Sequence, residues 1–105
     1  MDGIGIPVPT EAIAAFCRKW KIVEFALFGS VLTDHFRPDS DVDVLVKFVP
    51  DHEWGLFDHV TMQDDLSQIL GRKVDLVSRA SIEQSRNYLR RKEILGSARV
   101  VYEAA

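Results

Sequence analysis

Apolar positions along the first third of the chain predict a helix followed by a strand. The earliest ones recur at i, i+3, i+4 and i+7, the spacing of an amphipathic helix. They are Ile13, Phe16, Cys17 and Trp20. Thr10 precedes them as a candidate N-cap. Ile22–Phe28 is almost wholly apolar and rich in β-forming residues, so it predicts a buried strand that stops at Gly29.

A turn at Arg37–Ser40 separates this strand from the next two elements. Asp41–Val49 begins with polar–apolar alternation and is rich in valine, which predicts a second strand ended by Pro50. Gly55–Leu70 carries apolar residues at helical spacing, and Gly71 stands where a helix-ending glycine is expected. The middle of the chain therefore predicts a strand and then a helix.

The last third predicts a strand, a helix and a final strand. Lys73–Val77 alternates between polar and apolar residues and is short enough for one strand. Ser81 with Gln84 three residues later resembles a capping box, which predicts a helix running to about Leu95, where a glycine follows. Arg99–Glu103 predicts the closing strand.

This order of elements predicts an α/β or α+β fold in which helices flank a small mixed β-sheet. The link between the first two strands is too short for the helical crossover that parallel neighbours need, so we expect a mixed sheet. No repeat, low-complexity tract or linker divides the 105 residues. We therefore expect residues 1–105 to form one domain.

Composition narrows the function classes. The single cysteine, Cys17, allows no intrachain disulfide, and neither a signal peptide nor a stretch of ~18 apolar residues is present, so we expect a cytoplasmic protein without a membrane partner. The formal net charge is −3, whereas nucleic-acid-binding proteins usually carry a basic surplus. Direct nucleic-acid binding is therefore not expected, and a homo-oligomer stays open.

Three aspartates give the chain its candidate chemistry. Asp41 and Asp43 are two residues apart in a predicted strand, so they share one face of the sheet. Asp75 lies in the third predicted strand. Magnesium is usually held by one or two carboxylates and by substrate phosphates, and a third carboxylate permits a second ion about 3.5–4 Å from the first. The aspartates predict a magnesium site of one or two ions.

The Gly29–Ser30 pair completes this pattern. Glycine lets the backbone approach a phosphate closely, and the N–H groups and hydroxyl that follow are suited to bind an anion. The alternative is that Asp41 and Asp43 face water after a turn, while Asp75 pairs with Arg72 or Lys73. An Asp-x-Asp pair alone would favour that alternative, but Gly29–Ser30 before it and an acidic third strand after it favour a functional site.

At this point the chain resembles a known superfamily. Gly29–Ser30, ten intervening residues and then Asp41–Asp43 match the G-S-x10-D-x-D signature of the DNA polymerase β-like nucleotidyltransferases. Within that superfamily, Arg37–Val46 and Leu70–Val77 are similar to the minimal nucleotidyltransferases, a group that includes the antitoxin partners of HEPN-domain toxins. The resemblance extends from the first predicted helix to Tyr102.

The resemblance implies the polymerase β-like nucleotidyltransferase fold and a role for each residue. Gly29 and Ser30 would contact the triphosphate of ATP, and Asp41, Asp43 and Asp75 would hold Mg²⁺, with Asp75 also the general base. The implied reaction is transfer of AMP to a protein hydroxyl, such as a tyrosine of a HEPN-domain toxin. The alternatives are an antitoxin that neutralises its partner by binding alone and the catalytic subunit of a small-molecule nucleotidyltransferase.

Two further features affect this interpretation. Many relatives have a basic residue and a glycine at positions that are Thr33 and Asp34 here, and an acid near the phosphate predicts weaker triphosphate binding. The basic residues Arg86, Arg90 and Arg91 are most simply a solvated surface, and their functional interpretation is a docking face for an acidic partner or for the nucleotide.

Overall fold

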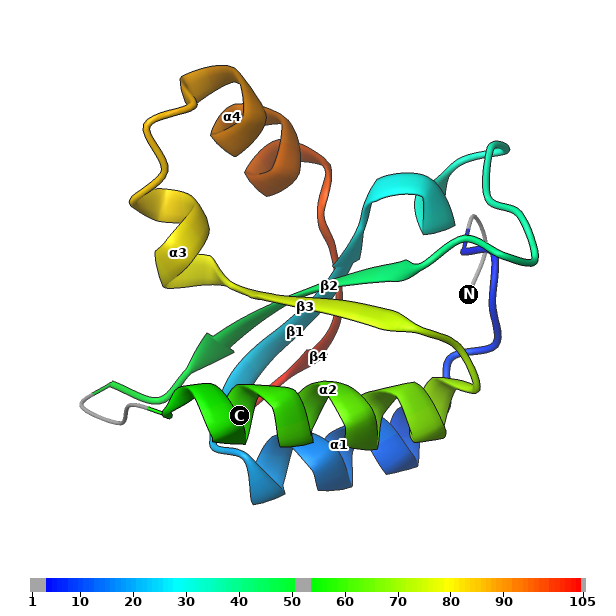
Figure 1. Ribbon diagram of the computed structural model, residues 1–105, viewed down its shortest axis with the longest axis vertical. Coiled ribbons are helices and arrows are strands. Elements are labelled where there is room, and N and C mark those ends of the chain that lie inside the picture. The colour runs from blue at the N-terminus through cyan, green and yellow to red at the C-terminus, as the bar shows by residue number, and fades with distance from the viewer. Residues whose placement is uncertain (1–3, 51–53, 105) are drawn as a thin grey trace.

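The computed structural model describes residues 4–50 and 54–104 and shows a four-stranded sheet with helices on both faces (Figure 1). In chain order the elements are α1 (Thr10–Lys19), β1 (Ile22–Phe28), the 3₁₀ turn η1 (Gly29–Leu32), β2 (Val42–Phe48), α2 (Leu56–Leu70), β3 (Val74–Ser78), α3 (Arg79–Glu83), α4 (Tyr88–Ser97) and β4 (Arg99–Glu103). Within the described ranges no helix is long and apolar enough to cross a bilayer.

The sheet is mixed, as the sequence predicts, with strand order β3-β2-β1-β4. β1 is antiparallel to both of its neighbours, β2 and β4, while β2 and β3 are parallel and joined through α2. The apolar run of β1 accounts for its central place, because a strand covered on both faces needs no polar side. The carboxyl end of β1 consequently meets the amino ends of β2 and β3 at one edge of the sheet.

Two hydrophobic cores lie on opposite faces of the sheet. The larger one packs α1 and α2 against alternate strand residues, among them Phe25, Val42 and Val44. The smaller one, beneath α3 and α4, contains five buried residues: Ala26, Phe28, Leu45, Ile82 and Ile94. Figure 1 shows α1 and α2 together below the sheet and α3 and α4 above it. The smaller core leaves part of its face of the sheet uncovered.

Cys17 lies inside the larger core and is fully buried. Burial raises the pKa of its thiol to about 12, and nearby Arg18 lowers it only in part. A thiol that stays protonated reacts slowly, so Cys17 is a packing residue. At the start of the same helix the N-cap expectation was wrong, because Pro9 occupies the cap position and Thr10 is the first helical residue.

The single helix predicted from Ser81 to Leu95 is instead two helices, α3 and α4. The side chain of Ser78 accepts a hydrogen bond from the backbone N–H of Ser81, so Ser78, and not Ser81, caps the first of them. Asn87 caps the second helix by accepting from the backbone N–H of Arg90, 3.0 Å away. The chain must bend between the caps, because Ile82 and Ile94 pack into the same small core. The glycine after Leu95 ends neither helix, since α4 continues to Ser97.

Helix α2 agrees with its predicted limits, but the apolar side chains near its amino-terminal end are exposed. Met62 and Leu66 are its buried residues, whereas Leu56, Phe57 and Val60 are 77%, 88% and 49% exposed. The backbone N–H of Gly55 donates to the carboxylate of Asp58, which fixes the first turn. The amino-terminal turn of α2 is therefore set by capping, with its large apolar side chains in solvent.

Gly71 and Gly96 provide a test of the backbone conformation at two open positions. Gly71 ends α2 in the left-handed region at φ +66°, and a Cβ there would meet no atom within 4 Å. We expect Gly71→Ala to lower the free energy of unfolding by about 1 kcal/mol through strain alone. Gly96→Ala, equally unobstructed but helical, should raise it by about 0.5–1 kcal/mol. Urea unfolding of both variants measures the difference, and a gain in stability from Gly71→Ala would contradict the left-handed assignment.

Candidate functional site

All five sequence-predicted site residues lie at the sheet edge where β1 ends and β2 and β3 begin. Gly29 and Ser30 follow the last residue of β1 directly, as the first residues of the η1 turn. Asp41 precedes β2, Asp43 is its second residue, and Asp75 is the second residue of β3. The topology thus gathers three segments that are distant in sequence.

The strand register places Asp43 at the centre of this group. It is the partner of Phe28 on one side and of Asp75 on the other. Adjacent strands are about 4.8 Å apart, and residues in parallel register project to the same face, so Asp43 and Asp75 are side by side. Asp41, two residues earlier, belongs to that face as well. It is the face of the smaller core, where α4 lies.

Burial distinguishes the three carboxylates. Asp41 and Asp75 are exposed, and Asp43 is half-buried. β3 is an edge strand, so Asp75 reaches solvent. Its charge is therefore not desolvated, although its neighbours in sequence are apolar. The desolvation cost falls on Asp43, which has a strand on each side.

The electrostatics follow from this arrangement. Burial raises the pKa of Asp43 most, the negative charges of Asp75 and Asp41 raise it further, and the positive charge of Arg90 opposes them. Three oxygen-donor side chains that repel one another suit a hard divalent cation such as Mg²⁺. In the described parts of the chain no three His, Cys, Asp or Glu side chains are already gathered closely enough to enclose a metal ion. The carboxylates are therefore neighbours at one edge without forming a closed cage.

Gly29 is required at the end of β1 for two reasons. Its φ of +77° lies in the left-handed region, which side chains rarely adopt. A Cβ at this position would also collide with the carboxylate of Asp43. The turn is closed behind it by Thr33, whose backbone N–H and hydroxyl both donate to the carbonyl oxygen of Ser30 at 2.9 Å. Besides the close approach to phosphate expected of it, Gly29 makes room for the side chain of Asp43.

Arg72 holds the loop that leads into Asp41. One of its terminal nitrogens donates to the carbonyl oxygens of Arg37 and Pro38, at 3.3 and 3.0 Å, and its guanidinium lies 4.6 Å from the ring centroid of Phe36. Arg72 therefore does not neutralise Asp75, the alternative that the sequence allowed. Among the described residues Asp75 takes part in no ion pair. Apart from a basic residue beside the third strand, no pattern in the sequence indicates this role of Arg72.

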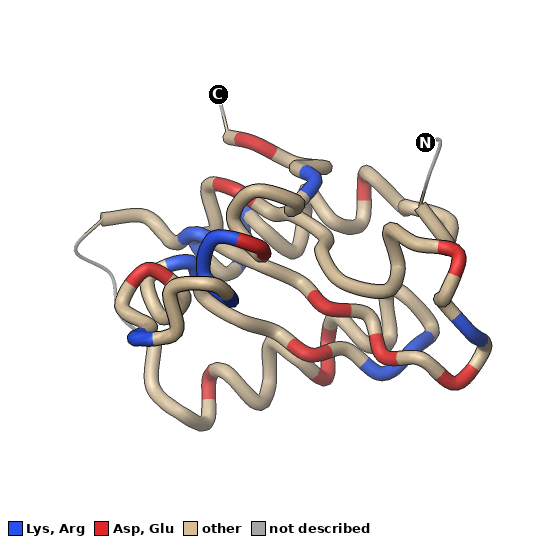
Figure 2. Tube along the Cα trace, turned by 90° about the horizontal axis from the view of Figure 1, so that it is seen from above, with Lys and Arg blue, Asp and Glu red and all other residues tan. Residues whose placement is uncertain are grey.

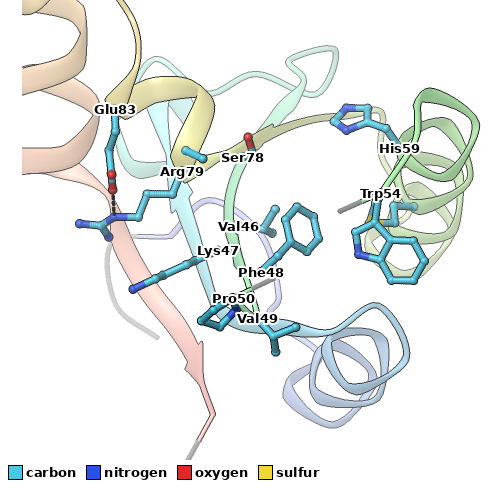
Figure 3. A pocket seen from close by; sticks show the side chains of 12 residues that line it. Val46, Lys47, Phe48, Val49, Pro50, Trp54, His59, Ser78, Arg79 and Glu83 are labelled. Atoms are coloured by element: carbon cyan, nitrogen blue, oxygen red, sulfur yellow. Dashed lines mark hydrogen bonds and ion pairs between the residues drawn. The ribbon is translucent and has the colours of Figure 1, made fainter. Parts of the chain in front are cut away.

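A cavity of about 640 Å³ lies at the opposite ends of β2 and β3, as Figure 3 shows. Phe48, Trp54 and His59 contribute to its lining, and Arg79 lies at its edge in ion pairs with Glu83 and, from β1, Glu24. None of the predicted site residues lines this cavity. The three carboxylates therefore lie at an open edge of the sheet, outside this cavity.

Asp43→Asn tests the repulsion at the site. A carboxyl group whose pKa is raised by folding destabilises the folded state when it is ionised, and this penalty disappears as the pH falls through the raised pKa. At pH 7 the neutral amide removes the penalty, so we expect the melting temperature of Asp43→Asn to be equal to or above that of the wild type. The gain should vanish at a pH below both pKa values of Asp43, and a large loss of stability at pH 7 would contradict the arrangement.

Arg72→Ala tests the anchoring of the loop before Asp41. Loss of two hydrogen bonds from a charged donor at an exposed position should cost about 1 kcal/mol and free residues 36–41. We expect faster amide exchange in that segment, measured by mass spectrometry, and little change in α1. Lys73→Ala, an exposed neighbour, serves as the matched control and should leave the exchange pattern unchanged. Equal exchange in both variants would rule out this role of Arg72.

Comparison with known sequences gives a family. The model of the nucleotidyltransferase domain matches residues 10–101. The protein adenylyltransferase MntA of Thermococcus cleftensis is 33% identical over 67 residues, which are 62% of this chain and 64% of that protein. A Methanocaldococcus jannaschii protein assigned as a protein adenylyltransferase is 34% identical over 64 residues, 61% of this chain and 64% of its own length. The chain thus spans under two thirds of these curated relatives.

Solved structures agree on the fold. A chain assigned as a minimal nucleotidyltransferase is 32% identical to this one, with a TM-score of 0.64 and 85% of each chain covered. A toxin–antitoxin structure with AMP-PNP has a TM-score of 0.69 at 18% identity and covers 92% of this chain and 75% of that one. The small mixed sheet with flanking helices, expected from the sequence, is confirmed as the architecture of the minimal nucleotidyltransferases.

Proposed function

Because this chain belongs to the nucleotidyltransferase domain family, we propose that it transfers AMP from ATP to a hydroxyl group of a partner protein. The acceptor we propose is a tyrosine of a HEPN-domain toxin, which makes the chain the antitoxin of the pair. One observation supports this most: Asp43 is the strand partner of Asp75, follows Asp41 by two residues and lies at the same sheet edge as the Gly29–Ser30 turn.

The similar proteins support the choice of reaction. One relative is named protein adenylyltransferase MntA, and solved structures of the same fold include a toxin–antitoxin pair with AMP-PNP and a tri-AMPylated HEPN toxin in complex with its MNT antitoxin. These are properties of those proteins. Their fold agrees with that of this chain, so the same nucleotide and the same class of partner are the most economical proposal.

Mg²⁺ fits the donor set of the site. In the proposal Asp41, Asp43 and Asp75 hold one or two ions, because three carboxylate oxygens on one face offer the hard ligands that magnesium prefers. When bound, the metal would neutralise charge on the triphosphate and favour ionisation of the acceptor hydroxyl. The repulsion that raises the pKa of Asp43 is the structural feature that a cation would relieve.

The chain's own residues then have distinct tasks. The backbone after Gly29 and the hydroxyl of Ser30 orient the triphosphate, since the turn brings N–H groups to the sheet edge. Asp75 accepts the proton of the attacking hydroxyl; it is exposed and has no ion-pair partner within the described residues, so it is accessible to an acceptor. The hydroxyl oxygen bonds to the α-phosphorus while the bond to the bridging oxygen of the β-phosphate breaks, and pyrophosphate leaves.

The partner must supply much of the binding surface. The carboxylates lie on an open edge, and transfer requires the acceptor oxygen in line with the α-phosphate, so a folded acceptor has to dock there. The resemblance to the antitoxins of HEPN-domain toxins implies a partner that acts on RNA. AMP on a tyrosine near the active site of such a partner would add bulk and negative charge, which repel RNA phosphates. Modification would silence the toxin in this way.

A binding antitoxin without chemistry is the second candidate. The η1 turn carries no basic residue in its last turn, and exposed Asp34 follows it. Both features weaken a triphosphate site. The three carboxylates argue against this candidate, because a protein that only binds its partner gains nothing from their mutual repulsion.

An adduct experiment tests the proposal. Incubating the protein with the product of its neighbouring gene, ATP and Mg²⁺ should add AMP to that partner, detected as a mass increase on an intact-protein spectrum and localised to tyrosine by peptide sequencing. Asp43→Asn should slow the reaction by about 10²-fold or more, since it removes a central metal ligand. Omitting Mg²⁺ should have the same effect.

The outcome also distinguishes the two candidates. If no adduct forms, and an Asp41→Asn, Asp43→Asn double variant still suppresses toxicity in cells, the chain is a binding antitoxin. If the adduct forms and the double variant loses both adduct and suppression, chemistry is the mechanism of neutralisation.

A further inference from the structure

The phosphate turn of this chain lacks a positive charge of its own. From Gly29 to Asp34 there is no basic residue, Thr33 is used to close the turn on Ser30, and exposed Asp34 adds a negative charge. A nucleoside triphosphate carries several negative charges, and protein sites usually meet them with an Arg or Lys in addition to the metal. In this fold the cation has to come from another element.

Helix α4 brings an arginine to the same face of the sheet. Ile94 anchors the helix in the small core beside Phe28 and Leu45. Arg90 is four residues earlier and so lies on the same side of the helix, one turn away. Asp43, which precedes Leu45 by two residues, is on this face of the sheet as well. Figure 2 shows basic positions in the α3–α4 region beside acidic positions of the strands.

Arg90 is also available to a ligand. Its backbone N–H is fixed by the Asn87 cap, 3.0 Å away, but its side chain is exposed and takes part in no ion pair or hydrogen bond among residues 4–50 and 54–104. Its positive charge nonetheless acts on the Asp43 carboxylate. Neighbouring Arg91 is engaged differently, since it donates to the carbonyl oxygen of Ser85 at 3.2 Å and lies over the ring of Tyr88.

We propose that Arg90 binds the β- and γ-phosphates of the nucleotide and supplies from α4 the cation that the Gly29–Leu32 turn lacks. The inference rests on the proposed function, because it takes the carboxylate edge as a nucleotide site. The planar guanidinium offers paired donors to phosphate oxygens, which an ammonium group cannot reproduce. The basic residues around α4 therefore divide into a ligand-binding Arg90 and a structural Arg91, and do not form one uniform docking face.

Calorimetric titration with ATP and with AMP, in the presence of Mg²⁺, tests this assignment. We expect Arg90→Gln to weaken ATP binding about tenfold or more, because charge-assisted contacts to two phosphates are lost, while AMP, which has no β- or γ-phosphate, binds within about twofold of the wild type. Arg90→Lys should recover only part of the ATP affinity. Lys92→Gln is the matched control, since Lys92 is exposed on α4 but about 200° around the helix from Arg90.

Each outcome has a definite meaning. If Arg90→Gln binds ATP as the wild type does, while the wild type transfers AMP to its partner, the inference is wrong and the proposed function stands. An equal loss of ATP and AMP affinity would overturn the inference in favour of a general structural role, which the melting temperature of the variant would reveal. A wild-type protein that binds no ATP would overturn both proposals.

Discussion

The cost of an ionised Asp43 at the start of β2 is the constraint around which this edge of the molecule is arranged. Burial contributes most to that cost, and the acidic neighbours across the strand pair and two residues earlier add to it. The cost arises from the topology of the sheet. β1 is antiparallel to β2 and β3 is parallel to β2, so three strand ends meet at this edge. Because Gly29 has no Cβ, the space that this atom would occupy is free for the carboxylate of Asp43.

The two faces of the sheet contribute unequally. The face under α1 and α2 carries most of the buried apolar residues and anchors the strands. The opposite face has a small core near Ile82 and Ile94 and leaves the acidic edge open. Free energy from the first face can therefore offset the repulsion on the second, and the site does not depend on burying its own residues. This division explains how a small chain can hold three carboxylates in one place.

Strands and the acidic positions were predictable from the sequence because both depend on local pattern. The apolar run Ile22–Phe28 predicts a buried strand, and the spacing of Gly29–Ser30 and Asp41–Asp43 sets which residues meet once two strands pair. Other features depend on contacts that no local pattern encodes. The break between α3 and α4 follows from two isoleucines sharing one core, and Asp75 is exposed because β3 has a neighbour on one side only.

The roles of two arginines were equally hidden. Arg72 donates hydrogen bonds to the backbone carbonyl oxygens of Arg37 and Pro38. Every residue has such an oxygen, so no sequence pattern indicates this contact. Arg90 was visible only as a member of a basic cluster. What distinguishes it from Arg91 is tertiary: Arg91 donates to the carbonyl oxygen of Ser85, and Ile94, one turn after Arg90, packs into the small core. Sequence pattern thus identifies the acids of the site more readily than the residues that position or complement them.

The central position of β1 has a consequence for how the chain is made. Its first partner, β2, follows after a short loop, but its second partner, β4, lies some 70 residues further along. Because distant pairings are the slowest to form, one side of β1 remains an open edge while most of the chain is synthesised. An unpaired edge rich in apolar residues invites pairing with other nascent chains. On the ribosome, β1 is therefore most exposed to wrong pairing just before β4 emerges.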